Sequence, residues 1–156
     1  MGLLLHRSVV IVLLVMIVAA YLFPVNIVVG RSMLPTLKPD DILITSRLDE
    51  PERGDVVVGY LYQNGERISV VKRVIGVGGD TVVVTKDSVI VNGKVVVEDY
   101  TYDRTMAQIL DRVEVPEGSL FVLGDNRNES CDSRALGCMT LKECIGVVER
   151  IIHTVR

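Results

Sequence analysis

The chain has 156 residues, a length that accommodates one domain with a small attachment. Hydrophobic residues make up 49% of it, but aromatic residues make up only 4% and tryptophan is absent. The apolar content is therefore mostly Val, Ile and Leu, and β-branched side chains suit pleated strands. The formal net charge of −3 and the lack of a basic stripe exclude a nucleic-acid-binding protein, so no nucleic-acid partner is expected.

The first feature along the chain is a run without charged side chains, from Ser8 to Gly30. A mostly apolar helix of about 20 residues is long enough to cross a bilayer. One interpretation is a cleaved signal peptide, because Val18-Ala19-Ala20 resembles a cleavage site, and the other is a retained signal anchor. Apolar residues continue past Ala20, so we expect residues 1–28 to form a short cytoplasmic tip and one transmembrane helix.

The charges that flank this run indicate its orientation. His6 and Arg7 precede it, and the positive-inside rule then places the N-terminus in the cytoplasm. Arg31, the next charge, weakens that bias. Residues 29–156 would form an extracytoplasmic domain at the cell membrane, with the lipid bilayer as a partner.

After residue 30 the chain is rich in short β segments separated by turn residues. Strands are expected at residues 42–45, 55–61, 68–75, 80–84, 88–91, 94–97, 119–123 and 145–152. Asn92-Gly93 supplies the positive φ angles of a two-residue hairpin turn. No long helical periodicity follows residue 30, apart from one or two helical turns expected at residues 105–110, so the pattern predicts an antiparallel β fold.

The three cysteines are Cys131, Cys138 and Cys144, an odd number that cannot pair completely within the chain. A Cys131–Cys138 disulfide and free thiols both remain open. The chain contains no CxxC pair and no cluster of histidines, so we expect no metal and no cofactor.

Lys72 and Ser32 are the first candidates for chemistry. Lys72 lies between Val70-Val71 and Val74-Ile75, and a lysine drawn into an apolar environment has a lowered pKa and can act as a general base. The competing interpretation is an ordinary strand lysine that points to solvent.

Ser32 follows a glycine and an arginine, as many turn serines do. A serine hydroxyl is a weak nucleophile unless a base takes its proton. The two histidines, His6 and His153, lie at opposite ends of the chain, so a lysine is the natural candidate for that base.

A polar segment at residues 124–134 contains Asp125, Asp132 and Arg134. Taken alone, these residues are typical of a salt-bridged turn. An Asp–Arg pair can also brace a loop that carries a catalytic group, through bidentate hydrogen bonds.

Three segments in this order resemble bacterial signal peptidase I, the leader peptidase family. Residues 32–37 read Ser-Met-Leu-Pro-Thr-Leu and match the pattern Ser-Met-x-Pro-Thr-Leu, and residues 72–80 match Lys-Arg-x-x-Gly-x-x-Gly-Asp. Residues 124–134 match Gly-Asp-Asn-x-x-x-Ser-x-Asp-Ser-Arg. The resemblance spans residues 8–150.

This resemblance implies a membrane-bound serine endopeptidase of the EC 3.4.21 class. Ser32 would attack the scissile carbonyl and Lys72 would take its proton, while the backbone N–H of Ser32 would help to hold the oxyanion. Ser130 would hydrogen-bond and orient the lysine. The other residues implied to support the site are Met33, Arg73, Asp125, Asp132 and Arg134.

The implied substrates are secreted preproteins, cut after small residues of the Ala-x-Ala type to remove the signal peptide. The implied fold is a mainly β, antiparallel and partly barrel-like catalytic domain, with residues 81–115 as a small accessory β region. Gly30 departs from family members that carry a second, hydroxyl oxyanion donor at that position. The pattern carries no information on oligomeric state.

Three other functions compete with this one. The self-cleaving repressors share a Ser-Met segment, but the apolar run and residues 124–134 disfavour them. A specialised serine–lysine peptidase of the same superfamily would process a narrow set of membrane, pilus or conjugation proteins. A membrane-tethered β binding domain would not be an enzyme, and its function would survive Ser32→Ala and Lys72→Ala.

Overall fold

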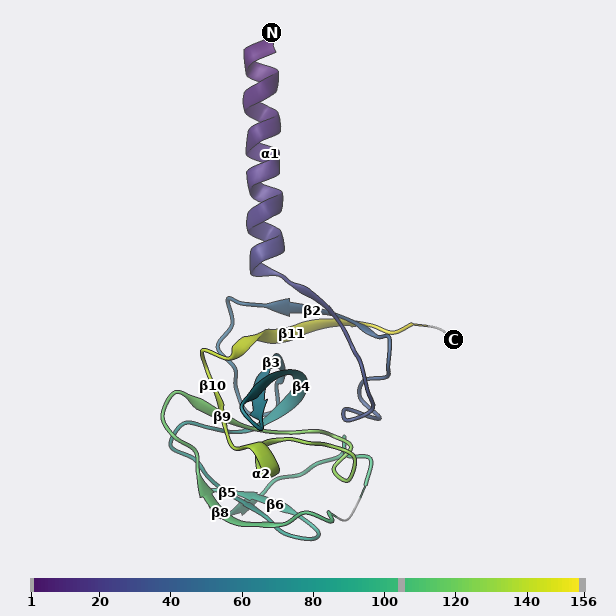
Figure 1. The fold of residues 1–156 in the computed structure, drawn as a ribbon, viewed down its shortest axis with the longest axis vertical. Coiled ribbons are helices and arrows are strands. Elements are labelled where there is room, and N and C mark those ends of the chain that lie inside the picture. The colour runs from purple at the N-terminus through teal and green to yellow at the C-terminus, as the bar shows by residue number, and fades with distance from the viewer. Residues whose placement is uncertain (1, 104–105, 155–156) are drawn as a thin grey trace.

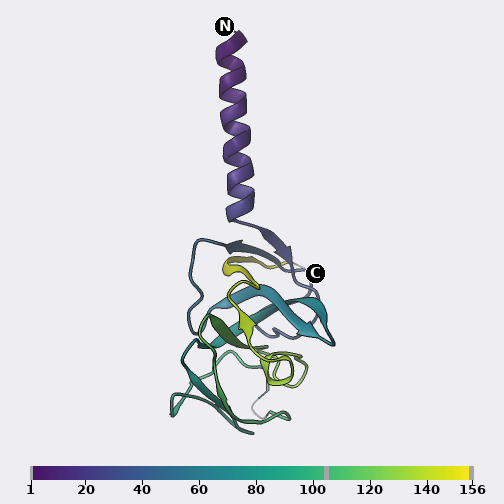
Figure 2. The same ribbon diagram turned by 60° about the vertical axis from the view of Figure 1, so that its left-hand side comes forward.

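The computed structural model describes residues 2–103 and 106–154, with the side chains of the first helix described from His6 onward. This helix, α1 (Gly2–Leu22), projects away from the rest of the chain in both views of Figure 1 and Figure 2. Its apolar side chains from Val9 to Val18 are all exposed. The strands and the second helix, α2 (Ser133–Leu136), lie together at the other end.

Among the residues that the structure describes, no helix is both long enough and apolar enough to cross a membrane. The transmembrane helix expected within residues 1–28 is therefore not found. The apolar run of the sequence is not one continuous helix, because α1 ends at Leu22, just before Pro24, whose ring does not continue a helix. The run then forms strand β1 (Val25–Ile27), which pairs with β2.

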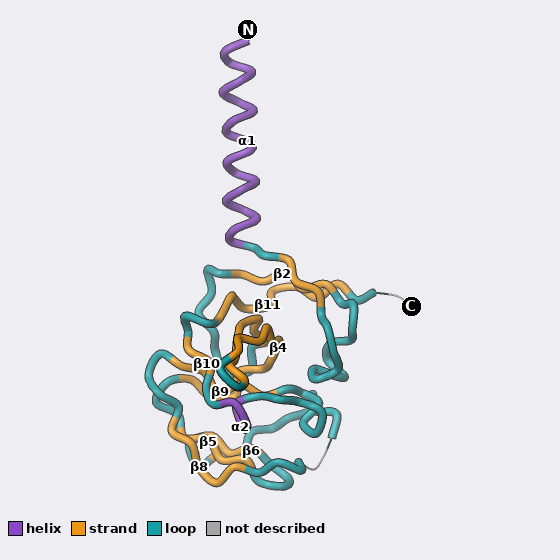
Figure 3. Tube along the Cα trace, viewed as in Figure 1, coloured by secondary structure: helices purple, strands orange, loops and turns teal. Residues whose placement is uncertain are grey.

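The first sheet has seven antiparallel strands in the described part of the chain. Their order is β1, β2 (Ile42–Ser46), β11 (Cys144–Ile152), β3 (Val56–Gln63), β4 (Glu66–Val77), β9 (Ser119–Leu123) and β10 (Met139–Thr140). Strand β4 is hydrogen-bonded to β3 on one side and to β9 on the other. Figure 3 shows the predominance of strands and loops after α1.

The second sheet has four strands, in the order β7 (Lys94–Val95), β6 (Val89–Val91), β5 (Thr81–Val84) and β8 (Leu110–Glu114). It falls within the accessory region of residues 81–115, of which residues 104–105 lie outside the described residues. The hairpin expected at Asn92-Gly93 is confirmed, with φ angles of 52° and 77°. Of the helical turns expected at residues 105–110, Thr105 is not described and residues 106–110 contain no helix.

The antiparallel β prediction is confirmed, but the partly barrel-like arrangement is wrong. Both sheets are open where the structure describes them, because β1 and β10 end the first sheet and β7 and β8 end the second. Three of these edge strands have three residues or fewer. Strands β1, β8 and β10 were not predicted from the sequence. With three and two residues, β1 and β10 are too short to show an alternation of apolar and polar residues.

The core positions the candidate site from two sides. Both sheets contribute to one apolar cluster, in which Ile75 and Phe121 of the first sheet pack with Val82 of the second. Another cluster contains Met33, Leu37 and Leu43, and Met33 directly follows Ser32 in the chain. Burial of each such side chain contributes about 1.5–3 kcal/mol, so the segment after β1 is held firmly against the sheet.

Candidate active site

Lys72 and Ser32 meet in the structure. Lys72 lies in the middle of β4, and its Nζ donates hydrogen bonds to Ser32 Oγ at 2.8 Å and to the carbonyl oxygen of Val71 at 3.0 Å. Lys72 is only 4% exposed and lies on the same face of β4 as the buried residues Val70 and Val74. The interpretation as an outward-pointing strand lysine is therefore wrong.

The surroundings of Lys72 favour an uncharged amine. Burial lowers the pKa of the Lys72 ammonium below its ordinary value, although the negative charges of Asp132 and Asp125 oppose this shift. An amine with a lowered pKa is more often deprotonated near neutral pH, and a deprotonated amine has a lone pair that can accept a proton. The contact between Nζ and Oγ is within the distance required for proton transfer.

Two segments hold Ser32 in place. On its C-terminal side, Met33 is buried in the core, and its carbonyl oxygen accepts a hydrogen bond from the Leu37 amide at 2.8 Å. On the other side, the backbone amide of Asn126 donates to the carbonyl oxygen of Ser32 at 3.0 Å, and the Asn126 side chain donates to the carbonyl oxygen of Arg31 at 3.1 Å. The serine is thus fixed by a segment almost a hundred residues further along the chain.

Ser32 and Lys72, together called the dyad below, line a cavity of about 410 Å³. Its lining is largely apolar, with the charged side chains of Arg31 and Glu129 and the thiol of Cys131. The lining residues are Ile27, Val28, Val29, Gly30, Arg31, Ser32, Met33, Ile68, Ser69, Val70, Val71, Lys72, Glu129 and Cys131. A polypeptide segment that entered this cavity would reach the hydroxyl and the amine together.

Arg73, next to Lys72 on β4, makes a buried ion pair with Asp125. Its Nε and Nη2 donate to the two carboxylate oxygens of Asp125 at 2.8 Å and 2.6 Å. Thr36 Oγ1 also donates to this carboxylate, at 2.5 Å. These bonds join β4, the segment after Ser32 and the 124–134 loop, as the bracing interpretation of Asp125 expects.

Asp132 and Arg134 form a second buried pair. The guanidinium of Arg134 donates through Nε and Nη2 to the two oxygens of Asp132, both at 2.8 Å, and neither side chain is exposed. Asp132 is also the N-cap of α2, because it accepts from the backbone amide of Arg134 at 3.2 Å. It accepts in addition from the amide of Gly124 at 3.1 Å, which ties the two ends of the 124–134 loop together.

Ser130 does not make the bond that the sequence analysis expects. Its Oγ is buried and has no hydrogen-bond partner in the described part of the chain, whereas Lys72 donates to Ser32 and to the Val71 carbonyl. Ser130 Oγ lies close to Gly124. A Cβ at Gly124 would overlap both this oxygen and the carbonyl oxygen of Ser32.

Thr36, Gly124 and Asn126 belong to the matched motifs, but the sequence predicted no role for them. In the structure Thr36 is hydrogen-bonded to Asp125, and Gly124 packs closely against Ser130. Asn126 is hydrogen-bonded to the carbonyl oxygens of Ser32 and Arg31. Their signal in the sequence was their place within two matched motifs. Contacts so distant in the chain cannot be read from local patterns.

Gly30 has a φ of 99°, a conformation that side-chain-bearing residues rarely adopt. The backbone conformation at this position therefore favours glycine. The three cysteines are free thiols in the structure, so the Cys131–Cys138 disulfide is not formed. No group of three or more His, Cys, Asp or Glu side chains gathers as a metal site among the described residues.

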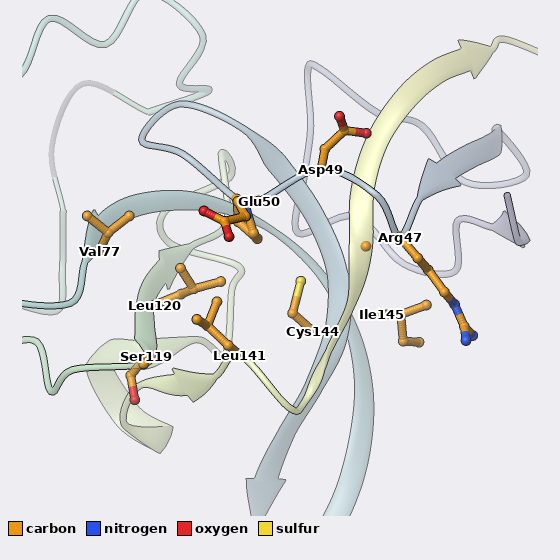
Figure 4. A pocket seen from close by; sticks show the side chains of 12 residues that line it. Arg47, Asp49, Glu50, Val77, Ser119, Leu120, Leu141, Cys144 and Ile145 are labelled. Atoms are coloured by element: carbon orange, nitrogen blue, oxygen red, sulfur yellow. The ribbon is translucent and has the colours of Figure 1, made fainter. Parts of the chain in front are cut away.

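A second cavity, of about 330 Å³, contains none of the predicted site residues. Figure 4 shows it between the connection from β2 to β3 and the strands β9 and β11, with Leu120, Leu141 and Cys144 around it. Its rim carries Arg47 and Glu50. It is separate from the dyad.

Comparisons with known proteins agree with the geometry. The family described as "Signal peptidase, peptidase S26" matches residues 3–153. Signal peptidase I of Bacillus caldolyticus is 34% identical over 146 residues, which cover 83% of this chain and 79% of that protein. Signal peptidase I P of Bacillus subtilis subsp. natto is 36% identical over 155 residues, which cover 89% of this chain and 82% of that protein.

A solved structure is similar as well. The crystal structure of a signal peptidase I from Enterococcus faecalis is 35% identical, with a TM-score of 0.51, and the match covers 64% of this chain and 97% of that one. An antiparallel β fold with a buried amine against a serine hydroxyl, together with these relatives, defines a serine peptidase. The chain belongs to the signal peptidase family, peptidase S26.

Proposed function

We propose that this protein is a serine endopeptidase that removes signal peptides from secreted preproteins, with Ser32 as nucleophile and Lys72 as general base. The observation that carries the proposal is the hydrogen bond of 2.8 Å between a buried lysine amine and the serine hydroxyl. Membership of the signal peptidase family supports the choice of substrate.

In the proposed acylation step, the neutral Lys72 amine takes the proton of Ser32 Oγ as this oxygen attacks the scissile carbonyl carbon. The carbonyl oxygen becomes an oxyanion, which the backbone N–H of Ser32 helps to stabilise. The C–N bond then breaks, and the Lys72 ammonium returns the proton to the leaving amine. Water attacks the resulting ester with Lys72 again as base, and the serine is released.

The largely apolar cavity beside the dyad supports a preference for small apolar residues before the cut, of the Ala-x-Ala type. Its residues Val28, Val70 and Val71 offer no charged partner to a substrate side chain. Arg31 and Glu129 also line this cavity and bring one positive and one negative side chain to it.

The protein is also proposed to associate with a lipid membrane through α1, whose apolar side chains are exposed along the described part of the helix. Flotation of the full chain with neutral vesicles tests this. We expect Ile17→Glu to reduce flotation and Val97→Glu, at an apolar and even more exposed position of the domain, to leave it unchanged. Equal flotation of both variants would rule out α1 as the contact.

The catalytic proposal is tested with the purified full chain in detergent and a preprotein that carries an Ala-x-Ala site. We expect cleavage at that site, its loss in Ser32→Ala and Lys72→Ala, and its retention in the matched control Lys142→Ala, an exposed lysine of the same domain. Circular dichroism establishes that the variants are folded. Unchanged cleavage in Lys72→Ala would refute the dyad and favour a different base.

A further inference from the structure

The segment of residues 98–102 belongs to the connection between β7 and β8 of the small sheet, and it contacts the 124–134 loop. Two contacts join them: Glu98 pairs with Arg127, and the amide of Tyr102 donates to the carbonyl oxygen of Asp125 at 3.1 Å. The same segment also contacts β4, where the guanidinium of Arg73 stacks on the ring of Tyr100 at 3.9 Å. Two of these partners, Arg73 and Asp125, already brace the dyad. Glu98 and Arg127 have no task in the proposed mechanism.

Arg127 is the largest side chain among the fully buried ones, at 2% exposure. Its Nη1 and Nη2 donate to the two oxygens of Glu98 at 2.8 Å and 2.6 Å. A guanidinium stays charged at any pH that the protein survives, and a buried charge is tolerated only when it is paired and hydrogen-bonded. Among the ion pairs of the described residues, Glu98 supplies the sole carboxylate that pairs with Arg127.

Arg127 in turn fixes the shape of the 124–134 loop. Its Nε donates to the carbonyl oxygen of Gly124 at 2.9 Å, and its own carbonyl oxygen accepts from Arg134 Nη2 at 2.6 Å. The residue before it, Asn126, donates through its amide to the carbonyl oxygen of Ser32. A continuous path of bonds therefore runs from Glu98 through Arg127 and the loop backbone to the nucleophile.

Tyr100 reinforces the same position. Its hydroxyl donates to Glu98 Oε1 at 3.0 Å, and its ring lies against Arg73, the neighbour of Lys72 on β4. Glu98 thus receives hydrogen bonds from Arg127 and from Tyr100, and it connects the loop behind Ser32 with the ion pair beside Lys72. Figure 1 shows the strands β5, β6 and β8 of the small sheet on the side of the large sheet where α2 lies.

We propose that Glu98 is a positioning residue of the active site, through which the small sheet holds the 124–134 loop against Ser32. This inference rests on the proposed function of Ser32 and Lys72. Without the carboxylate, Arg127 would draw water or withdraw from the loop, and the Asn126 amide would no longer hold the serine at a fixed distance from the amine. Displacements of about 1 Å at a reacting group can lower a rate by about a hundredfold.

The test compares Glu98→Gln, Glu98→Asp and the control Glu114→Gln in the full-length protein. Glu114 is in the same small sheet and pairs with Arg112, but both side chains are exposed, so its loss changes an ion pair without touching the loop. The first measurement is the single-turnover rate constant for acylation of Ser32 by a small activated ester, which bypasses preprotein binding. The second is hydrogen exchange at the amide of Asn126.

We expect Glu98→Gln to lower the acylation rate constant by about tenfold to a hundredfold, while the number of reactive sites per folded molecule stays the same. KM for a preprotein should change by less than about twofold, because the residue does not line the cavity of the dyad. Protection of the Asn126 amide should fall. Glu98→Asp should recover part of both losses, and Glu114→Gln should match the parent protein.

Equal rate constants and equal Asn126 protection in Glu98→Gln and in the parent, with only a lower unfolding temperature, would overturn the positioning role. Failure of the proposed function would give a different result, because the activated ester would then acylate the parent protein no faster than it acylates Ser32→Ala. In that case exchange at Asn126 still decides whether Glu98 holds the loop against Ser32.

Discussion

The amine of Lys72 lies 2.8 Å from the hydroxyl of Ser32, although 40 positions separate the two residues in the chain. Strand β4 brings the lysine to the middle of a seven-stranded sheet, and the buried Met33 anchors the serine in front of it. The lysine lies on the same strand face as Val70 and Val74, which are buried as well. This relationship leads to four predictions in addition to the experiments above.

Lys72→Arg should be as inactive as Lys72→Ala. A guanidinium keeps its proton in proteins, so it cannot take the proton of Ser32 even where it still reaches the hydroxyl. We expect preprotein cleavage to fall by about 10²–10⁴-fold, the usual contribution of a positioned general base. The measurement is kcat/KM with the same preprotein. Retention of activity would show that a positive charge, and not a base, is what the site requires.

Lys72→Met should change how stability depends on pH. Burial lowers the pKa of Lys72 in the folded protein, so at pH values between that pKa and the ordinary 10.5 the unfolded chain binds a proton that the folded chain does not. The free energy of unfolding of the parent should therefore rise with pH in this window, by at most about 1.4 kcal/mol per pH unit from this group. The methionine variant lacks this contribution.

Urea unfolding of both proteins at several pH values between neutrality and 10 measures the difference. Any stability advantage of the Met variant should shrink as the pH approaches 10.5, where the unfolded lysine also loses its proton. A difference that stays constant over this range would mean that Lys72 keeps its ordinary pKa in the folded protein.

Gly124→Ala should impair the site by steric overlap. The added Cβ would meet Ser130 Oγ and the carbonyl oxygen of Ser32, both in the tightest part of the loop. We expect a loss of about 1–3 kcal/mol of stability and a lower kcat, since the loop must shift away from the serine. Gly118→Ala is the control, because its strain at a φ of 70° costs stability far from the dyad. Equal kcat in the two variants would contradict the prediction.

Alkylation of Cys131 should block cleavage. This thiol is exposed and lines the cavity that contains Ser32 and Lys72, whereas Cys138 and Cys144 are half-buried and burial raises the pKa of both thiols. Iodoacetamide should therefore modify Cys131 first, and activity should fall in proportion. The residual activity of Cys131→Ser should resist the reagent. Full modification of Cys131 without loss of cleavage would show that substrate does not pass this thiol.

Local patterns in the sequence account for much of the fold. The Asn92-Gly93 hairpin follows from the φ angles of one dipeptide, and most long strands follow from runs of β-branched residues. The short strands β1 and β10 were missed because they consist of three and two residues and owe their existence to partners elsewhere in the chain. The expected transmembrane helix failed for a related reason, since part of the apolar run pairs with β2 as strand β1.

For the site, three ordered motifs were enough to name Ser32, Lys72 and the residues of the 124–134 loop. What the motifs could not supply was the contact of each side chain. From the sequence, Lys72 could be either buried or exposed to solvent. The alternation of residues along a strand does not tell which face of β4 is covered by other parts of the protein. The expected bond between Ser130 and the lysine is also not found, and the Ser130 hydroxyl has no hydrogen-bond partner in the described part of the chain.

By itself, the amino-acid sequence determined the β class, the hairpin and the identity of the residues that matter, because backbone propensities and motif spacing are local properties. Tertiary structure alone decided that Lys72 is buried and hydrogen-bonded to Ser32, and that Glu98 forms an ion pair with Arg127. The physical reason is that desolvation and ion pairing depend on which distant segments pack together. No pattern within a single strand contains that information.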